Sequence, residues 1–155
     1  MHTEFMERAI ELARKGMDAK DGGPFGAVIV RNSKIIGEGW NQVLASNDPT
    51  AHGEVMAIRD ATAKVSRFAL EDCEIYTTGQ PCPMCLGAIY WARIRHIYYG
   101  FGIGEAARIG FDDSEIFHEF SLPPEKRKIS QSQVCIDQAL SLIDDYSKTP
   151  GREPY

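Results

Sequence analysis

The stretches PTAHGEV (residues 49–55) and GQPCPMC (residues 79–85) each stand where a helix is expected to begin. Between the two helices lies the run CEIYTT (residues 73–78), which has the composition of a short strand. Successive helices on the same side of a sheet bring their first turns close together. These two stretches therefore predict a strand–helix repeat that gathers a histidine, a glutamate and two cysteines at one place.

The rest of the chain also alternates between helix and strand patterns. Helices are expected over residues 1–17, 52–65, 83–93, 112–120 and 137–148, and strands over residues 25–31, 35–41, 73–78, 96–101 and 132–136. The short connection at residues 32–34 makes the first two strands an antiparallel hairpin, so the sheet is not wholly parallel. The pattern predicts an α/β sandwich around a mixed sheet.

Length and composition favour one soluble domain over residues 1–155. The chain is 43% hydrophobic and 25% charged, and its net charge of −5 argues against a broad nucleic-acid or anionic membrane surface. Residues 1–17 carry acidic side chains without a continuous apolar run, so we expect no signal peptide, and no run approaches membrane-spanning length. We expect a cytoplasmic protein in which the lone cysteines Cys73 and Cys135 are buried and reduced.

His52, Cys82 and Cys85 form a ligand set that suits zinc. Three ligands of these types leave one tetrahedral position open, which is the arrangement expected of a catalytic rather than a structural site. The unpaired N–H groups of helix N-termini also stabilise thiolates. Glu54 points in a neighbouring direction from His52. Its expected role is to take a proton from water and hand it to a leaving amine.

Each of these features has a plainer interpretation when it is taken alone. His52 could be a capping or core histidine, and the Cys82–Cys85 spacing also occurs in thiol–disulfide motifs. Redox chemistry, however, gives no role to the histidine and glutamate, and a structural zinc site would need a fourth ligand. The combination favours a catalytic metal site.

The residues His52-Gly53-Glu54, followed by PCPMC at residues 81–85, resemble the signature of the cytidine and deoxycytidylate deaminase superfamily. The resemblance implies a three-layer sandwich, with a five-stranded mixed sheet and helices on both faces. It also implies one zinc ion (Zn²⁺) per chain and hydrolytic removal of an exocyclic amine from a nucleobase.

Further segments are similar to those of bacterial guanine deaminases, from about residue 5 to the C-terminus. The segments are GGPFGAVIV (22–30), SNDPTAHGEV (46–55), PCPMCLGAIYWAR (81–93) and IGFDDSEI (109–116). This resemblance implies a free purine substrate, with guanine converted to xanthine and ammonia. Transfer-RNA adenosine deaminases share the zinc motifs but usually differ in the first and last segments. Plant guanosine deaminases share much of the pattern, so base and nucleoside both remain open.

Roles for several further residues follow partly from this resemblance and partly from their chemistry. Asp113 would assist proton movement onto the departing ammonia, with Asp112 as the alternative, and either could instead cap a helix. Asn41 can donate and accept hydrogen bonds, which suits the lactam edge of guanine, although it could be a solvated turn residue. Phe25 and Trp91 could stack on the purine or could simply be core aromatics.

The C-terminal tail predicts an assembly. The helix expected over residues 137–148 has one apolar stripe, and Pro150 and Pro154 prevent the tail from extending that helix. In related deaminases this tail closes over a neighbour's pocket. We therefore expect a homodimer in which residues near 149–155, including Tyr155, help to close the partner's active site.

Three residues depart from the usual pattern of the family. Gly53 stands where alanine is usual, Gly79 where this branch often has cysteine, and Gln80 where glutamate is usual. These departures leave room for a related aminated heterocycle such as guanosine, a pterin or a triazine. The sequence is also compatible with a tRNA adenosine deaminase, or with a zinc-stabilised binding module without catalysis, although the binding module leaves Glu54 without a role.

Overall fold

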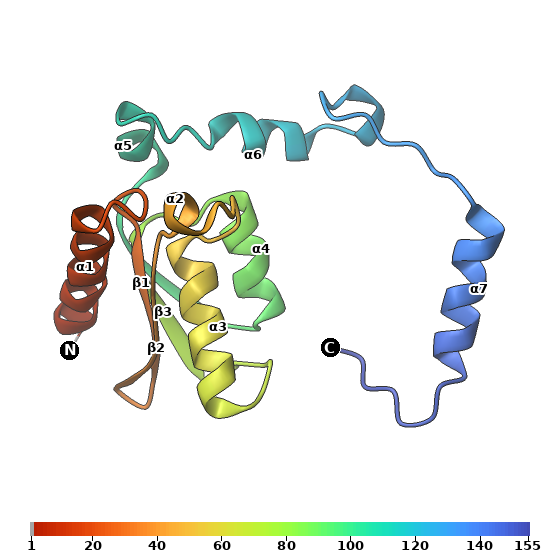
Figure 1. Ribbon diagram of the computed structural model, residues 1–155, viewed down its shortest axis with the longest axis horizontal. Coiled ribbons are helices and arrows are strands. Elements are labelled where there is room, and N and C mark those ends of the chain that lie inside the picture. Colours follow the sequence, from red (N-terminus) through yellow and green to blue (C-terminus); the bar gives the residue numbers. More distant parts are fainter. Residues whose placement is uncertain (1) are drawn as a thin grey trace. The chain divides into compact units, whose positions relative to one another are not determined.

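The computed structural model describes residues 2–155, which form two compact units divided between Ile116 and Phe117 (Figure 1). The elements of the first unit are α1 (His2–Asp18), β1 (Gly26–Arg31), β2 (Lys34–Trp40), α2 (Val43–Ser46), α3 (Gly53–Val65), β3 (Cys73–Gly79), α4 (Pro83–Trp91), β4 (His96–Phe101) and α5 (Ile103–Arg108). Helix α6 (Ser114–Ser121) crosses the boundary, and the second unit continues with the 3-10 turn η1 (Pro124–Lys126) and α7 (Ile136–Ser147). The short helices α2 and α5 were not expected from the sequence.

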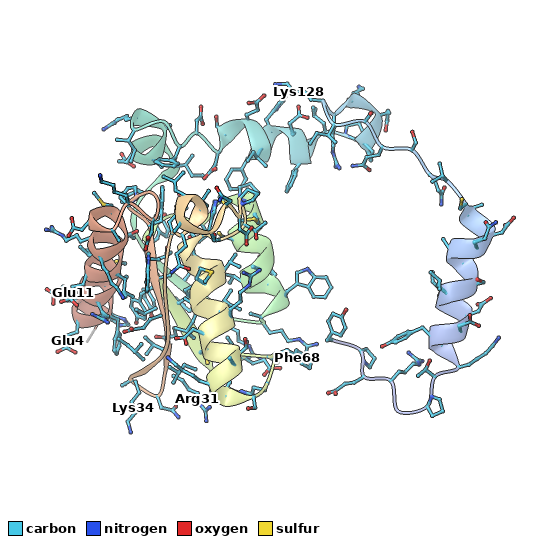
Figure 2. The ribbon with its side chains drawn as sticks, in the orientation of Figure 1. Glu4, Glu11, Arg31, Lys34, Phe68 and Lys128 are labelled. Atoms are coloured by element: carbon cyan, nitrogen blue, oxygen red, sulfur yellow. The ribbon has the colours of Figure 1, made fainter. Side chains whose placement is uncertain are left out.

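The sheet has the strand order β2-β1-β3-β4 and is mixed, as the sequence predicted. Strand β1 pairs antiparallel with both β2 and β3, whereas β3 and β4 run parallel. The β1–β2 hairpin turns through Asn32 and Ser33, whose φ angles are 50° and 58°. Two residues in this conformation match the twist of the flanking strands. Arg31 and Lys34 flank this turn (Figure 2).

The sheet has four strands and not five, so the expected fifth strand at residues 132–136 is wrong. Residues 131–135 have no regular structure, and Ile136 begins α7. A strand needs the backbone of a neighbouring strand, and Cys135 has φ 51°, which is incompatible with an extended chain. The expected burial of Cys135 is also wrong, because that residue is exposed, whereas Cys73 is buried as predicted.

Helices cover both faces of the sheet in the first unit. Alternate residues of β1 point to opposite faces. Val28 and Val30 pack with Phe5 and Leu12 of α1 on one face. Ala27 and Ile29 join the opposite cluster, which includes residues of α3 and α4. Figure 1 shows α1 on one side of the sheet and the α3–α4 pair on the other. This arrangement sets the first turns of α3 and α4 beside each other.

The described residues 2–155 contain no helix with the length and apolar character needed to cross a membrane. Within the second unit, α7 exposes five large apolar side chains. They are Ile136, Leu140, Leu142, Ile143 and Tyr146.

Candidate active site

The first turns of α3 and α4 carry the candidate metal ligands. His52 is the N-cap residue of α3 and Cys82 is the N-cap residue of α4, both with extended backbone conformations. Pro83 follows at the first helical position, where its fixed φ and missing N–H suit a helix start. The Cys85 main-chain N–H donates to the Cys82 sulfur at 3.4 Å. The first turn of α4 therefore fixes the position of Cys82, and a main-chain N–H stabilises negative charge on its sulfur.

The donor atoms of His52, Cys82 and Cys85 all lie within 4.8 Å of one another. Nδ1 of His52 is 3.6 Å from Sγ of Cys82 and 3.5 Å from Sγ of Cys85. A tetrahedral zinc with Zn–S near 2.3 Å and Zn–N near 2.0–2.1 Å separates nitrogen and sulfur by about 3.6 Å. The spacing and the soft donor set therefore fit one zinc ion.

The electrostatics of the two cysteines differ. A hydrogen bond from Cys85 lowers the pKa of Cys82 to about 4, and His52 acts in the same direction. The same hydrogen bond, together with burial, raises the pKa of Cys85. The interaction with Cys82 also raises the pKa of His52. The lowered pKa of Cys82 favours a thiolate at this position, which suits a cation ligand.

Glu54, on the first turn of α3, is buried with 4% of its surface exposed. Thr77 of β3 donates through Oγ1 to Glu54 Oε1 at 3.1 Å, and the Cys85 thiol donates to Oε2 at 3.3 Å. Burial raises the pKa of Glu54. Thr77 was not predicted from the sequence as a site residue. Thr77 lies two residues after the core residue Ile75, so both side chains face the same side of β3. This alternation could have indicated that Thr77 points toward the interior.

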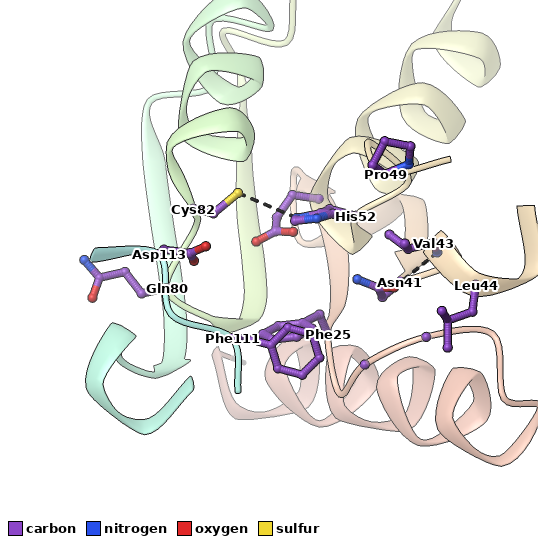
Figure 3. A pocket seen from close by; sticks show the side chains of 13 residues that line it. Phe25, Asn41, Val43, Leu44, Pro49, His52, Gln80, Cys82, Phe111 and Asp113 are labelled. Atoms are coloured by element: carbon purple, nitrogen blue, oxygen red, sulfur yellow. Dashed lines mark hydrogen bonds between the residues drawn. The ribbon is translucent and has the colours of Figure 1, made fainter. Parts of the chain in front are cut away.

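A cavity of about 200 Å³ opens beside these residues (Figure 3). Six residues that were assigned to the site from the sequence line it: Phe25, Asn41, His52, Glu54, Cys82 and Asp113. Others were not assigned to the site from the sequence, among them Gly22, Gly23, Val43 and Phe111. Phe111 meets Phe25 edge to face, with ring centres 5.0 Å apart, so the two rings form one apolar wall.

Asn41 and Asp113 supply polar groups to the cavity. The Asn41 Oδ1 accepts the Val43 N–H at 3.2 Å, which leaves the amide nitrogen as the group that faces away from Val43 (Figure 3). Burial raises the pKa of Asp113, and the charge of Cys82 adds to this effect. Asp112 instead accepts two hydrogen bonds from Ser114, at 3.0 and 2.6 Å. The placement favours Asp113 over Asp112 for the proton-transfer role.

Residues 1–101 match the family model for the zinc-binding region of cytidine and deoxycytidylate deaminases. The chain belongs to this deaminase family. Membership confirms the predicted family, the hydrolytic deaminase class and the zinc cofactor, for which His52, Cys82 and Cys85 are the matching donor cluster.

The chain is similar to two deaminases of different substrate classes. Guanine deaminase of Bacillus subtilis is 47% identical over 154 residues, covering 99% of both chains. Its crystal structure superposes with a TM-score of 0.96 over 100% of this chain and 99% of the other. A tRNA-specific adenosine deaminase of Haemophilus influenzae is 38% identical over 121 residues, covering 74% of this chain and 69% of the relative.

A third relative is a guanine deaminase from Nitrosomonas europaea. Its structure is 28% identical, has a TM-score of 0.65, and covers 94% of this chain and 84% of its own.

The three departures from the deaminase pattern fit their surroundings. A Cβ on Gly53 would lie 2.9 Å from the main-chain oxygen of Phe25, and one on Gly79 would lie 2.8 Å from the Phe101 ring. The neighbouring groups therefore leave no room for a Cβ at either glycine without a shift. Gln80 lines the cavity, and its main-chain N–H donates to the Phe101 oxygen at 2.8 Å.

Two predicted substrate contacts are not among the residues that line the described cavity. Trp91 ends α4, is 69% exposed and is not among the residues that line the described cavity. Tyr155 belongs to the second unit and is 77% exposed. Their roles toward a substrate stay predictions.

Proposed function

We propose that this deaminase converts free guanine to xanthine and ammonia. The observation that carries the proposal is the extent of the similarity to the B. subtilis guanine deaminase, which spans 99% of the chain. The similarity therefore includes the segment with Phe111 and Asp113, which lies beyond the part that matches the family model. The match to the H. influenzae tRNA adenosine deaminase covers only 74% of the chain.

The chain's own residues divide the work of the proposed reaction. Zinc, when it is bound to His52, Cys82 and Cys85, supplies an activated water at neutral pH. Glu54 takes a proton and delivers it to the amine on C2 of guanine, while Thr77 holds the carboxyl in place.

The walls of the cavity orient the base. Asp113 lines the cavity and assists the departure of ammonia. Phe25 and Phe111 offer an apolar surface to the flat ring, and the Asn41 amide nitrogen donates to an acceptor on the base.

Ammonia release tests this assignment. The zinc-loaded protein is incubated separately with guanine, guanosine, adenine, cytosine, cytidine, a pterin, a triazine and tRNA, and ammonia and products are quantified. We expect xanthine from guanine at the highest kcat/KM and no inosine in tRNA. Inosine in tRNA without xanthine from guanine would reject the proposal in favour of tRNA deamination. A higher kcat/KM for guanosine, a pterin or a triazine would replace guanine with that compound as the proposed substrate.

The proposed enzyme is a single functional domain over residues 1–155 that works as a homodimer. Helix α7 exposes an apolar face, which a second copy would cover, and two-fold dimers are the commonest soluble oligomers. The tail after α7 contains Pro150 and Pro154 and does not continue the helix. We propose that residues 149–155, with Tyr155, close the partner's cavity. We also propose that Trp91, which is exposed and outside the cavity lining, adds an aromatic surface for the purine.

Light scattering and a deletion test the assembly. We expect a dimer at assay concentration, and we expect removal of residues 149–155 to raise KM or lower kcat while zinc content stays constant. A monomer, or unchanged kinetics after the deletion, would reject the role of the tail.

The proposed substrate also fits a cytoplasmic enzyme that does not bind nucleic acid. The net charge of −5 supports this assignment, because a polyanion would be repelled overall. Cell fractionation tests the location, and a filter-binding measurement with tRNA tests the absence of nucleic-acid binding.

A further inference from the structure

The loop between α1 and β1 contributes two adjacent glycines, Gly22 and Gly23, to the cavity wall. Neither has a positive φ angle. Residues with side chains can adopt such backbone conformations. The limit on side-chain size at these positions is therefore the space around them, and that space is occupied by the groups that face the substrate.

Gly22 lies directly against the side chain of Asn41. A Cβ added to Gly22 would be 1.9 Å from Asn41 Oδ1 and 2.8 Å from its Cγ. The amide is held by the Val43 N–H, which donates to Oδ1, and the Asn41 main chain is held separately by its N–H, which donates to the Phe25 oxygen at 2.8 Å. Any side chain at residue 22 would turn the amide and redirect its nitrogen.

The loop itself is poorly able to move away from Asn41. The Asp21 main-chain oxygen accepts from Leu44 and Ala45 at 2.9 and 3.1 Å, and its N–H donates to the Gly16 oxygen at 2.9 Å. The Asp21 carboxylate also accepts from Trp40 Nε1 at 2.7 Å. With residue 21 fixed by α1, α2 and β2, the strain at residue 22 falls on the Asn41 amide.

Gly23 lies in the same way against the aromatic wall formed by Phe25 and Phe111. A Cβ there would be 2.8 Å from Cζ of Phe111 and 2.9 Å from Cε2 of Phe25. Phe111 is 42% exposed, so its ring has room to swing outward. A side chain at residue 23 would therefore open the apolar wall by displacing Phe111.

We propose that Gly22 and Gly23 are specificity-determining positions that act through the groups they touch. Gly22 keeps the Asn41 nitrogen aimed at an acceptor atom of a flat heterocycle, and Gly23 leaves room for the Phe25–Phe111 wall. The inference rests on the proposed function, because it takes this cavity to be the site that binds the base. Both glycines are positioning residues and do not touch the reacting atoms.

Three matched glycine-to-alanine variants test the inference. Gly22→Ala and Gly23→Ala are compared with Gly104→Ala, since Gly104 is exposed on α5 and a Cβ there would have no atom within 4 Å. Steady-state kcat and KM for guanine are measured together with zinc content. Because the groups bind ground state and transition state alike, we expect KM to rise about 10-fold to 100-fold in Gly22→Ala, with kcat, zinc and Gly104→Ala unchanged.

A double-mutant cycle separates the amide from the backbone. In an Asn41→Ala background the tightest contact is absent, so we expect Gly22→Ala to change KM less than about threefold. The residual change in KM would come from the main-chain oxygen of Asn41, which would lie 2.8 Å from the added Cβ. For Gly23→Ala we expect the same KM as for Phe111→Ala.

Each outcome decides the inference. Wild-type KM in both Gly22→Ala and Gly23→Ala overturns it, and so does an undiminished effect of Gly22→Ala in the Asn41→Ala background. If Gly22→Ala alone is insoluble, a soluble double variant supports the inference and an insoluble one overturns it.

Failure of the proposed function is recognised separately, in the wild-type protein. If the wild type prefers another heterocycle to guanine, the same KM comparisons are made with that compound, and the glycine inference stands or falls on them.

Discussion

Removing the hydrogen bond from Thr77 to Glu54 tests whether this bond positions the Glu54 carboxyl for proton transfer. Thr77 is fully buried, and its Oγ1 lies 3.1 Å from Glu54 Oε1. The substitution Thr77→Val keeps the β-branched shape and removes the donor. A hydrogen bond to a charged group contributes about 1.5–3 kcal/mol. Since about 1.4 kcal/mol corresponds to tenfold in rate, we expect kcat to fall about 10-fold to 150-fold.

The assay follows xanthine formation at saturating guanine, with zinc content measured on the same samples. Thr77→Ser restores the hydroxyl and is expected to recover most of the lost kcat. Thr78→Val is a matched control on the next residue. Its Oγ1 donates to the Pro24 oxygen at 2.9 Å and accepts from the Gly26 N–H at 3.1 Å, so we expect lost thermal stability with a smaller change in kcat. Wild-type kcat in Thr77→Val, or no recovery in Thr77→Ser, would refute the reasoning.

Three further predictions follow from the site and the surface. Glu54→Gln should retain zinc by elemental analysis but lose about 10²–10⁴-fold in kcat, and loss of zinc would make Glu54 a ligand instead. Cys85→Ala should lose both zinc and activity, and full activity without metal would contradict the assigned site. The Arg8 guanidinium donates to Glu38 at 2.8 Å and lowers the pKa of that carboxyl. Glu38→Gln should therefore reduce the free energy of unfolding at about pH 7 by less than about 1 kcal/mol, because the pair is partly exposed. This difference should disappear as the pH falls below about 4.3 and through the lower folded pKa, measured by urea denaturation.

The metal donors and the mixed sheet could be predicted from the sequence because their signals are local. Pro83 marks a helix start, the two cysteines are three residues apart, and the alternation of Ala27, Val28 and Ile29 gives a strand with two buried faces. The fifth strand could not be judged in this way. An apolar run such as SQVCI is consistent with a strand, but only a neighbouring strand with free backbone groups makes it one.

The walls of the cavity were less predictable than the donors. Gly22 and Phe111 are far apart in the sequence, and each has an ordinary loop interpretation until the fold brings them to one cavity. Thr77 is similar, since a threonine in a strand is common and only the position of Glu54 gives its hydroxyl a role. The alternation of Ile75 and Thr77 indicates a buried face of β3, but a contact between residues far apart in the chain leaves no local pattern that names the partner.

The strand order also has a consequence for how this protein acquires its site during folding. The β1–β2 hairpin closes through a two-residue turn and can form early, because little chain entropy is lost. His52 and Cys82 are 30 residues apart, and they meet only after β3 has joined β1 and both α3 and α4 have docked. Helical signal in circular dichroism should therefore return before activity in refolding experiments. Regained catalysis reports closure of the whole sheet, and not the presence of its parts.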